Sequence, residues 1–241
     1  MCGRFAITLA PEVFREHYGY PEQPNFPPRY NVAPTQPVPI VLAENGAPRF
    51  RLVRWGFLPG WVKDPKDFPL VINARAETLL EKPTFKAAIR RRRCVFVADA
   101  FYEWRREGNA KAPFAIRMAD GGPMPLAGLW ETYSDPDGGE IDTAAIVTTS
   151  ANGTLAAIHH RMPVILPREE IGAWLDCAGV DERAAVAMAR PCADERIVLY
   201  PVSPRVNRVA NDGPENLAPL AQAPRPAAPP RPAGGEQGSL F

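Results

Sequence analysis

The second residue of this chain is a cysteine, and its place beside the initiator methionine gives it distinctive chemistry. Because Cys2 is small, we expect Met1 to be removed, which leaves a thiol and a free α-amine on adjacent carbons. The amine has a reference pKa of about 7.7–8.0 and a thiol about 8.5, and we expect the nearby Arg4 to lower the pKa of Cys2. A 1,2-aminothiol captures an aldehyde as a thiazolidine or acts as an N-terminal nucleophile in acyl transfer. The structural alternative is a small apolar residue in a first strand.

Two further residues have side chains suited to moving protons. Glu103 lies between Tyr102 and Trp104, and aromatic neighbours that exclude water from a carboxylate suit it to proton transfer. His159 begins a His-His-Arg run and brings an imidazole. Alone, each residue also fits a structural role, which is a salt bridge to Arg105 or Arg106 for Glu103 and a satisfied hydrogen bond for His159.

Arginines are clustered in this chain although its net charge is only +1. That balance argues against a protein coated in basic surface for duplex DNA. Arginines beside aromatic residues are typical of single-strand channels, in which each stacked base contributes about 1–3 kcal/mol. The run from Arg90 to Arg93 fits a phosphate groove, and it fits equally well a solvated helix end, because cations favour a helix C-terminus.

The composition bounds the class of protein. The chain has 241 residues, of which 46% are hydrophobic, enough for one sizeable core. No apolar run of about 18 residues and no signal segment occur, so we expect a cytoplasmic protein with no membrane partner. The four cysteines have no CxxC spacing and the three histidines no zinc pattern, so we expect free thiols and neither a metal nor another cofactor. We also expect a monomer.

The elements that must position these residues are of mixed type. Helices are predicted over 11–18, 84–93, 167–175 and 181–189, and strands over 38–43, 49–57, 94–97, 114–117, 126–130, 144–149 and 197–202. Residues 30–35 are too polar and proline-broken for a helix or a strand. Many short strands with few helices predict an α+β fold, a single compact domain whose strongly curved, open-barrel-like mixed or antiparallel sheet is flanked by short helices. The catalytic domain would cover 1–219, and the Pro- and Ala-rich residues 220–241 would form a disordered tail.

Several motifs occur together in this chain. They are Cys2-Gly3-Arg4, Tyr30-Asn31-Val32-Ala33-Pro34-Thr35, Trp55-Gly56-Phe57-Leu58-Pro59-Gly60-Trp61, Asn73-Ala74-Arg75-Ala76-Glu77-Thr78, Asp99-Ala100-Phe101-Tyr102-Glu103-Trp104 and His159-His160-Arg161-Met162-Pro163-Val164. Their order over Cys2 to about Pro219 resembles the SRAP (SOS response-associated peptidase) family, whose members crosslink abasic sites in single-stranded DNA. The chain departs from many relatives at His160, where they carry Asp, and at Val62, where some carry a second aromatic residue.

The resemblance implies roles for individual residues. It makes Cys2 the nucleophile that captures the sugar aldehyde, Asn73 the amide that orients the terminus, Glu103 the proton shuttle and His159 the residue that helps to open the sugar. It implies phosphate contacts for Arg4, Arg75 and Arg161, and packing against splayed bases for Pro34 and Trp61. It further implies abasic single-stranded DNA as the partner, a reversible thiazolidine crosslink, lyase-like chemistry and a peptidase activity that removes Met1.

Two other functions remain open on the sequence alone. A Met-Cys-Gly start is shared with amidotransferases of the N-terminal-nucleophile type, but their Arg-Trp-Ala-Thr-like run is Arg54-Trp55-Gly56-Phe57 here. A module that reads damaged or modified DNA without covalent chemistry is the second alternative, and it predicts that Cys2→Ala leaves function intact.

The last five residues form a separate motif. The end Gln237-Gly238-Ser239-Leu240-Phe241 resembles the peptide by which bacterial repair proteins dock on the DNA polymerase sliding clamp. Gln237, Leu240 and Phe241 would make the contacts with the clamp.

Overall fold

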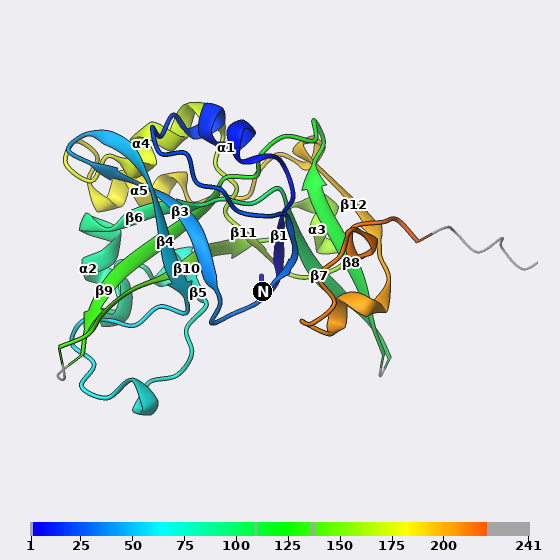
Figure 1. The fold of residues 1–241 in the computed structure, drawn as a ribbon, viewed down its shortest axis with the longest axis horizontal. Coiled ribbons are helices and arrows are strands. Elements are labelled where there is room, and N and C mark those ends of the chain that lie inside the picture. The colour runs from blue at the N-terminus through cyan, green and yellow to red at the C-terminus, as the bar shows by residue number, and fades with distance from the viewer. Residues whose placement is uncertain (1, 109, 136–137, 221–241) are drawn as a thin grey trace, which may run out of the picture.

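Two β-sheets packed against each other make up most of the molecule (Figure 1). The structure is a computed structural model, and it describes residues 2–108, 110–135 and 138–220. One sheet has the strand order β12-β8-β7-β1-β2, and the other has the order β11-β10-β4-β3-β6-β9, with β5 paired to β10. The first sheet consists of β1 (Phe5–Ile7), β2 (Arg29–Val32), β7 (Ala100–Glu107), β8 (Ala110–Met118) and β12 (Ile197–Pro201). The second consists of β3 (Pro37–Glu44), β4 (Ala47–Trp55), β5 (Asn73–Arg75), β6 (Arg93–Phe96), β9 (Leu126–Ser134), β10 (Glu140–Ser150) and β11 (Arg161–Pro163).

Short helices cover the outside of the sheets. They are α1 (Pro11–Tyr18), α2 (Pro83–Arg91), α3 (Gly153–Ala156), α4 (Ile171–Leu175) and α5 (Glu182–Met188). Helix α1 begins at a proline and ends at Gly19, which adopts the left-handed conformation with φ of 75°. Asn152 starts α3 by accepting a hydrogen bond from the Leu155 amide, and Asp181 starts α5 in the same way.

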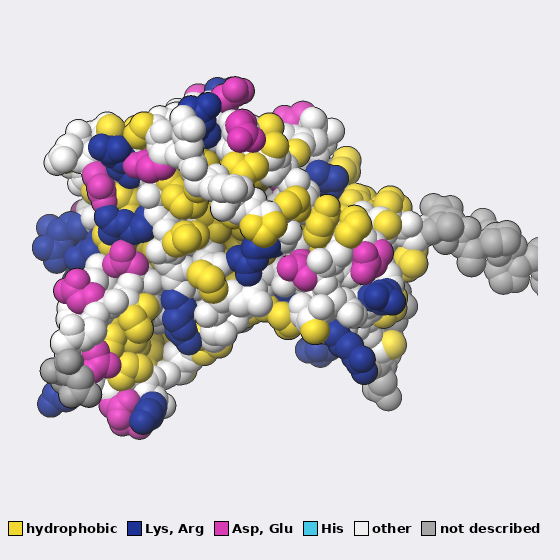
Figure 2. Space-filling model, in the orientation of Figure 1, with side chains coloured by type: hydrophobic (Ala, Val, Ile, Leu, Met, Phe, Trp, Pro, Cys, Tyr) yellow, Lys and Arg dark blue, Asp and Glu magenta, His cyan; other side chains and the backbone are white. Residues whose placement is uncertain are grey.

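The core lies between the inner faces of the two sheets. Phe5, Trp55 and Phe96 form its aromatic centre, with ring centroids 5.0 Å apart for Phe5 and Trp55 and 6.2 Å apart for Phe5 and Phe96. Burial of a side chain of this size contributes about 1.5–3 kcal/mol. The molecule is hollowed along one edge in the space-filling view, between the part that carries β9 and the part that carries the β7–β8 hairpin (Figure 2).

The α+β class and the curved mixed sheet are confirmed. The 11–18 helix is confirmed, and so are the strands over 38–43 and 49–57, found as β3 and β4. Asn45 and Gly46 form the two-residue turn between them, with φ values of 52° and 78°. The expectation of irregular structure from residue 30 is wrong for residues 30–32, which lie in β2. The reason is that β2 pairs with β1 through its backbone, while the buried Asn31 amide finds backbone carbonyls to donate to.

Candidate active site

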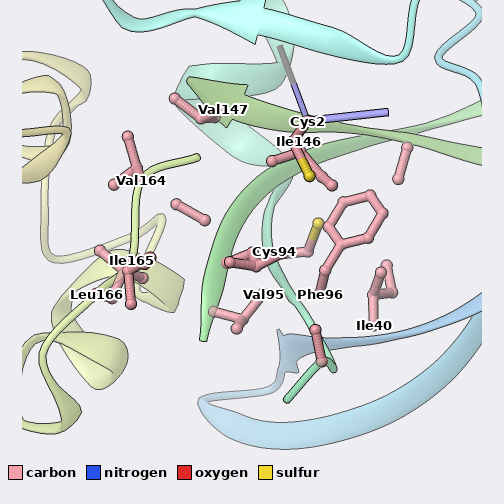
Figure 3. Close-up of a cluster of buried hydrophobic side chains, with 14 of the residues drawn as sticks. Cys2, Ile40, Cys94, Val95, Phe96, Ile146, Val147, Val164, Ile165 and Leu166 are labelled. Atoms are coloured by element: carbon pink, nitrogen blue, oxygen red, sulfur yellow. The ribbon is translucent and has the colours of Figure 1, made fainter. Parts of the chain in front are cut away.

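Cys2 lies at the start of β1, where the two sheets meet. Its side chain has no exposed surface and points into the apolar cluster that holds Ile146, Cys94 and Phe96 (Figure 3). Burial raises the pKa of the Cys2 thiol to about 12, and the Glu103 carboxylate adds to the increase. The expectation that Arg4 lowers this pKa is therefore wrong, because desolvation dominates and the Arg4 guanidinium is bound elsewhere. The thiol is neutral at pH 7.

Asn73 holds the backbone at Cys2. It stands on β5, which runs parallel to β10 with Asn73 opposite Ile146. The Asn73 Nδ2 donates a 2.9 Å hydrogen bond to the Cys2 carbonyl oxygen. Its other polar atom, Oδ1, is buried and has no hydrogen-bond partner among the described residues. A second donor from the terminus, such as a free α-amine, would satisfy that oxygen.

Glu103 approaches the same point from the other sheet. Strand β7 pairs with β1 until the Tyr102 amide donates to the Arg4 carbonyl, and Glu103 is the next residue. Its side chain is only 3% exposed. The carboxylate raises the pKa of Cys2, and it acts on His159 in the same direction. One negative charge thus influences both of the other titratable groups.

His159 follows α3 and is fixed by the arginine two residues later. Its Nδ1 lies 2.9 Å from the Arg161 amide nitrogen. The Arg161 carbonyl oxygen lies 3.1 Å from the same Nδ1, so each of the two contacts fits a different tautomer of the ring. Burial lowers the pKa of His159, although Glu103 opposes the shift. Burial thus favours the uncharged ring at neutral pH.

A cavity of about 370 Å³ joins Glu103 and His159 to solvent. It is lined by Glu103, Trp104, Arg106, Lys111, His159 and Asn207. A larger cavity of about 710 Å³ lies beside α1 and α4 and contains none of the motif residues assigned to chemistry. We place the site at the smaller cavity because the proton-transferring side chains open into it.

The three arginines expected at phosphates differ in their surroundings. Arg4 donates to Asn31 Oδ1 at 2.6 Å and to the Val206 carbonyl at 2.8 Å, so it ties the C-terminal segment to β1. Arg161 forms two hydrogen bonds to Glu77, at 2.6 and 3.0 Å. Arg75 is exposed, and in the described part of the chain its guanidinium makes no ion pair. Phosphate binding by all three stays a prediction.

The two residues expected to pack against bases lie on the surface near the sheet ends. Pro34 follows β2 and is partly exposed. Trp61 is 61% exposed and has its ring edge-on to Phe68, with centroids 5.7 Å apart. Neither residue is brought into contact with Cys2. By contrast Trp55, of the same aromatic motif, is a core residue whose Nε1 donates to the Ile72 carbonyl.

Several site residues were not singled out from the sequence. Thr148 on β10 accepts from Arg161 Nη2 through both its carbonyl and its hydroxyl oxygen, at 2.7 and 3.2 Å. Glu77 stands in the Asn73–Thr78 motif, which was the only signal for it. Asn207, in the 3₁₀ turn Pro204–Asn207, accepts from the Trp104 indole at 2.8 Å across 103 residues of chain, a contact that no local pattern indicates.

Comparison with known proteins identifies the family of this chain. The pattern of the family described as SOS response associated peptidase (SRAP) matches residues 1–209. The chain belongs to the SRAP family. A relative in Bacillus subtilis (strain 168), named abasic site processing protein YoqW, is 36% identical over 219 residues, covering 89% of this chain and 98% of that protein. The Gallus gallus relative, named abasic site processing protein HMCES, is 33% identical over 264 residues, covering 91% of this chain and 78% of that protein. A crystal structure of a Bacteroides thetaiotaomicron protein superposes with a TM-score of 0.79 at 26% identity, covering 90% of this chain and 100% of that one.

Two expectations for this SRAP-family chain concern membrane-spanning helices and the C-terminal tail. In the described ranges, none of the helices is both long enough and apolar enough to span a membrane. Gln237, Leu240 and Phe241 lie outside the described residues, as does nearly all of the expected 220–241 tail. The domain boundary and the clamp motif therefore stay predictions.

Proposed function

We propose that this protein binds single-stranded DNA at abasic sites and, once Met1 is removed, crosslinks to the sugar through Cys2. The observation that carries the proposal is the convergence of Asn73, Glu103 and His159 on the start of the chain. The names of its relatives, which describe processing of abasic sites, support the same substrate. DNA damage and a stalled replication fork are the setting in which such a site occurs in a single strand.

The chemistry begins with the sugar. An abasic deoxyribose is mostly a closed ring, and its opening to the C1′ aldehyde needs a proton at the ring oxygen. His159 relays that proton: its neutral ring takes the proton of the C1′ hydroxyl and delivers it to the ring oxygen, so that the bond from C1′ to the ring oxygen breaks, the C1′ carbonyl forms and the imidazole ends neutral. The Cys2 α-amine then attacks C1′, and loss of water gives a Schiff base. Glu103 takes the proton from the attacking nitrogen and returns it to the departing hydroxyl.

The thiol closes the ring in the last step. Since the pKa of the Cys2 thiol is raised, sulfur attacks the Schiff-base carbon as its proton leaves, and that proton ends on the nitrogen. A C–S bond forms, the C=N double bond becomes single, and a thiazolidine results. Addition of water in the reverse order releases the aldehyde, which makes the crosslink reversible. No cofactor takes part in these steps.

The same terminus must first be produced. We infer that the peptidase activity in the family description corresponds to removal of Met1, which frees the amine that the crosslink requires. Asn73 Oδ1, buried and without a hydrogen-bond partner among the described residues, is positioned to accept from the new amine. Intact-mass measurement of purified protein checks this, because retention of Met1 in a crosslinking-competent protein would contradict it.

The decisive experiment is a crosslinking assay. Incubation with a uracil-containing single-stranded oligonucleotide, treated with uracil glycosylase, should give a shifted band on a denaturing gel. Cys2→Ala should give none, while an untreated oligonucleotide controls for the lesion. A missing band with the unaltered protein, or an equal band with Cys2→Ala, would reject the covalent function and leave a non-covalent reader of damaged DNA as the alternative.

A further inference from the structure

The β7–β8 hairpin adds two cations to the site that neither the motifs nor the comparisons assign. Arg106 and Lys111 are directly opposite each other in the antiparallel register of β7 and β8. Both line the cavity that holds Glu103 and His159. Side chains paired in this way have neighbouring Cβ atoms, so their two charges act on one place.

Both side chains are exposed, and no carboxylate whose side chain the structure describes forms an ion pair with either one. Arg161, by contrast, is held by Glu77, and Arg4 by Asn31 and the Val206 carbonyl. An anion that binds between Arg106 and Lys111 therefore displaces no carboxylate of the described side chains, whereas one that binds Arg161 competes with Glu77.

Beyond Tyr102, no described residue pairs with β7 on its β1 side. Pairing of β1 with β7 ends where the Tyr102 amide donates to the Arg4 carbonyl, and the Cys2 carbonyl accepts from Asn73 instead. In a strand, alternate N–H groups point to the same side, so the amides of Trp104 and Arg106 follow that of Tyr102 toward this edge. Asn207 holds the Trp104 ring at the cavity wall through the indole N–H.

We propose that Arg106 and Lys111 form a phosphate subsite that grips the DNA backbone on one flank of the abasic sugar. This subsite rests on the proposed function for its substrate. It gives the DNA strand a contact at the cavity that holds Glu103 and His159, and so sets the position of C1′ relative to these side chains. A phosphate is the fitting ligand because both cations are exposed, the neighbouring backbone offers N–H donors, and the reacting sugar carries phosphates on both sides.

The first test measures the salt dependence of binding to an undamaged single-stranded oligonucleotide by fluorescence anisotropy. Removal of one cation that binds a phosphate should reduce the slope of log affinity against log salt by about 0.7. Arg106→Gln/Lys111→Gln should therefore lower the slope by about 1.4. Lys86→Gln/Arg183→Gln removes one lysine and one arginine from exposed positions on α2 and α5, at the opposite end of the molecule from the hairpin in Figure 1, and should leave the slope unchanged. Equal slopes for the hairpin variant and the unaltered protein, or an equal drop in the control variant, would overturn the subsite.

The second test separates phosphate binding from chemistry. Free 2-deoxyribose presents the aldehyde without phosphates, so the hairpin variant should form its adduct at the rate of the unaltered protein, measured by intact mass. On an abasic oligonucleotide below saturation the variant should be slower by roughly tenfold or more, as expected when two charge-assisted hydrogen bonds are removed. Equal slowing on both substrates would assign these residues to the chemistry and overturn the subsite. Failure of the unaltered protein to crosslink rejects the proposed function instead, and the salt slopes still decide whether the hairpin binds phosphate.

Discussion

At the scale of single residues, the site separates the two nucleophilic atoms of Cys2 by environment. The thiol lies in an apolar cluster next to a carboxylate, and both raise its pKa. Removal of Met1 frees the α-amine of Cys2. This amine belongs to the backbone of Cys2, which the Asn73 side-chain amide binds. For the proposed crosslink, we therefore expect the amine to react first and sulfur to enter only after the Schiff base has formed.

This order predicts a specific pH profile for crosslinking. The rate should rise as the amine loses its proton, near its reference pKa of about 7.7–8.0, and then stay level to about pH 10. A thiol of ordinary pKa would add a second rise near about 8.5, whereas the raised pKa of Cys2 moves that rise to about 12. Single-turnover rates on an abasic oligonucleotide measure the profile, and a second rise between about pH 8 and 10 would show that the thiol ionises early.

Glu103→Gln tests the carboxylate in two independent ways. Crosslink formation or release should slow by about 10²–10⁴-fold, the usual contribution of a general acid–base, while DNA affinity changes only a few-fold. The substitution also removes the negative charge that raises the pKa of Cys2, so alkylation of the thiol should begin at a lower pH than in the unaltered protein. Slowed crosslinking without this shift in the alkylation profile would place Glu103 too far from the thiol.

At the scale of elements, the Arg90–Arg93 run contains one arginine with a structural role. Arg93 is 1% exposed and donates to the carbonyl oxygens of Ile89, Trp174, Asp176 and Val180. It thereby joins the end of α2 to the end of α4, where helix carbonyls lack partners of their own. The helix-end interpretation is correct for this residue, and its burial keeps the Arg93 guanidinium out of any phosphate groove.

Arg93→Met should therefore destabilise the fold without weakening DNA binding. Leaving several buried carbonyls without a donor should lower the free energy of unfolding by about 2–4 kcal/mol. Arg90→Met, at an exposed position with only a 3.6 Å ion pair to Glu182, should change it by less than about 0.5 kcal/mol. Urea unfolding of both variants provides the measurement, and equal effects would show that the four hydrogen bonds contribute little.

At the scale of the whole molecule, the site exists only because two sheets meet. Arg4 and Glu103 come from the sheet of β1 and β7, whereas Asn73, Arg75 and Arg161 stand on strands that flank β10. Lys and Arg side chains lie on both sides of the hollow edge in Figure 2. A single strand laid along that edge would meet both sheets at once.

The tail adds a prediction on the same scale. Seventeen residues from Leu220 to Glu236 reach about 50 Å when extended at about 3.1 Å each, and burial of Leu240 and Phe241 would contribute about 1.5–3 kcal/mol apiece. The full chain should bind purified bacterial sliding clamp with micromolar affinity, and Leu240→Ala/Phe241→Ala should abolish binding while crosslinking stays unchanged. Titration by anisotropy or calorimetry decides it, and equal binding by both chains would exclude the terminal motif.

The sequence alone determined the chemistry-bearing residues and the local elements. A cysteine at position 2, an Asn-Ala-Arg run after an apolar stretch, and Pro11 and Gly19 around α1 act through neighbours along the chain, so their patterns are visible in the letters. Strand β7, which carries Glu103, was missed because its residues alternate poorly in polarity. One face of β7 packs against the C-terminal segment and the other lies at the candidate site. Neither face therefore has the uniformly apolar side chains of a core face or the uniformly polar side chains of a solvent-exposed face.

Only the tertiary structure decided which charged groups lie close enough to shift each other's pKa values and which hydrogen-bond donors already have a partner. The raised pKa of Cys2 comes from burial between two sheets and from Glu103, about a hundred residues away, and outweighs Arg4 two positions along the chain. Nothing in the sequence shows that Arg4, Arg93 and Arg161 already have partners. In the structure each donates a hydrogen bond to a residue more than eighty positions away. Desolvation and hydrogen bonding depend on the three-dimensional neighbours of a group, and those neighbours are set by the packing of the sheets.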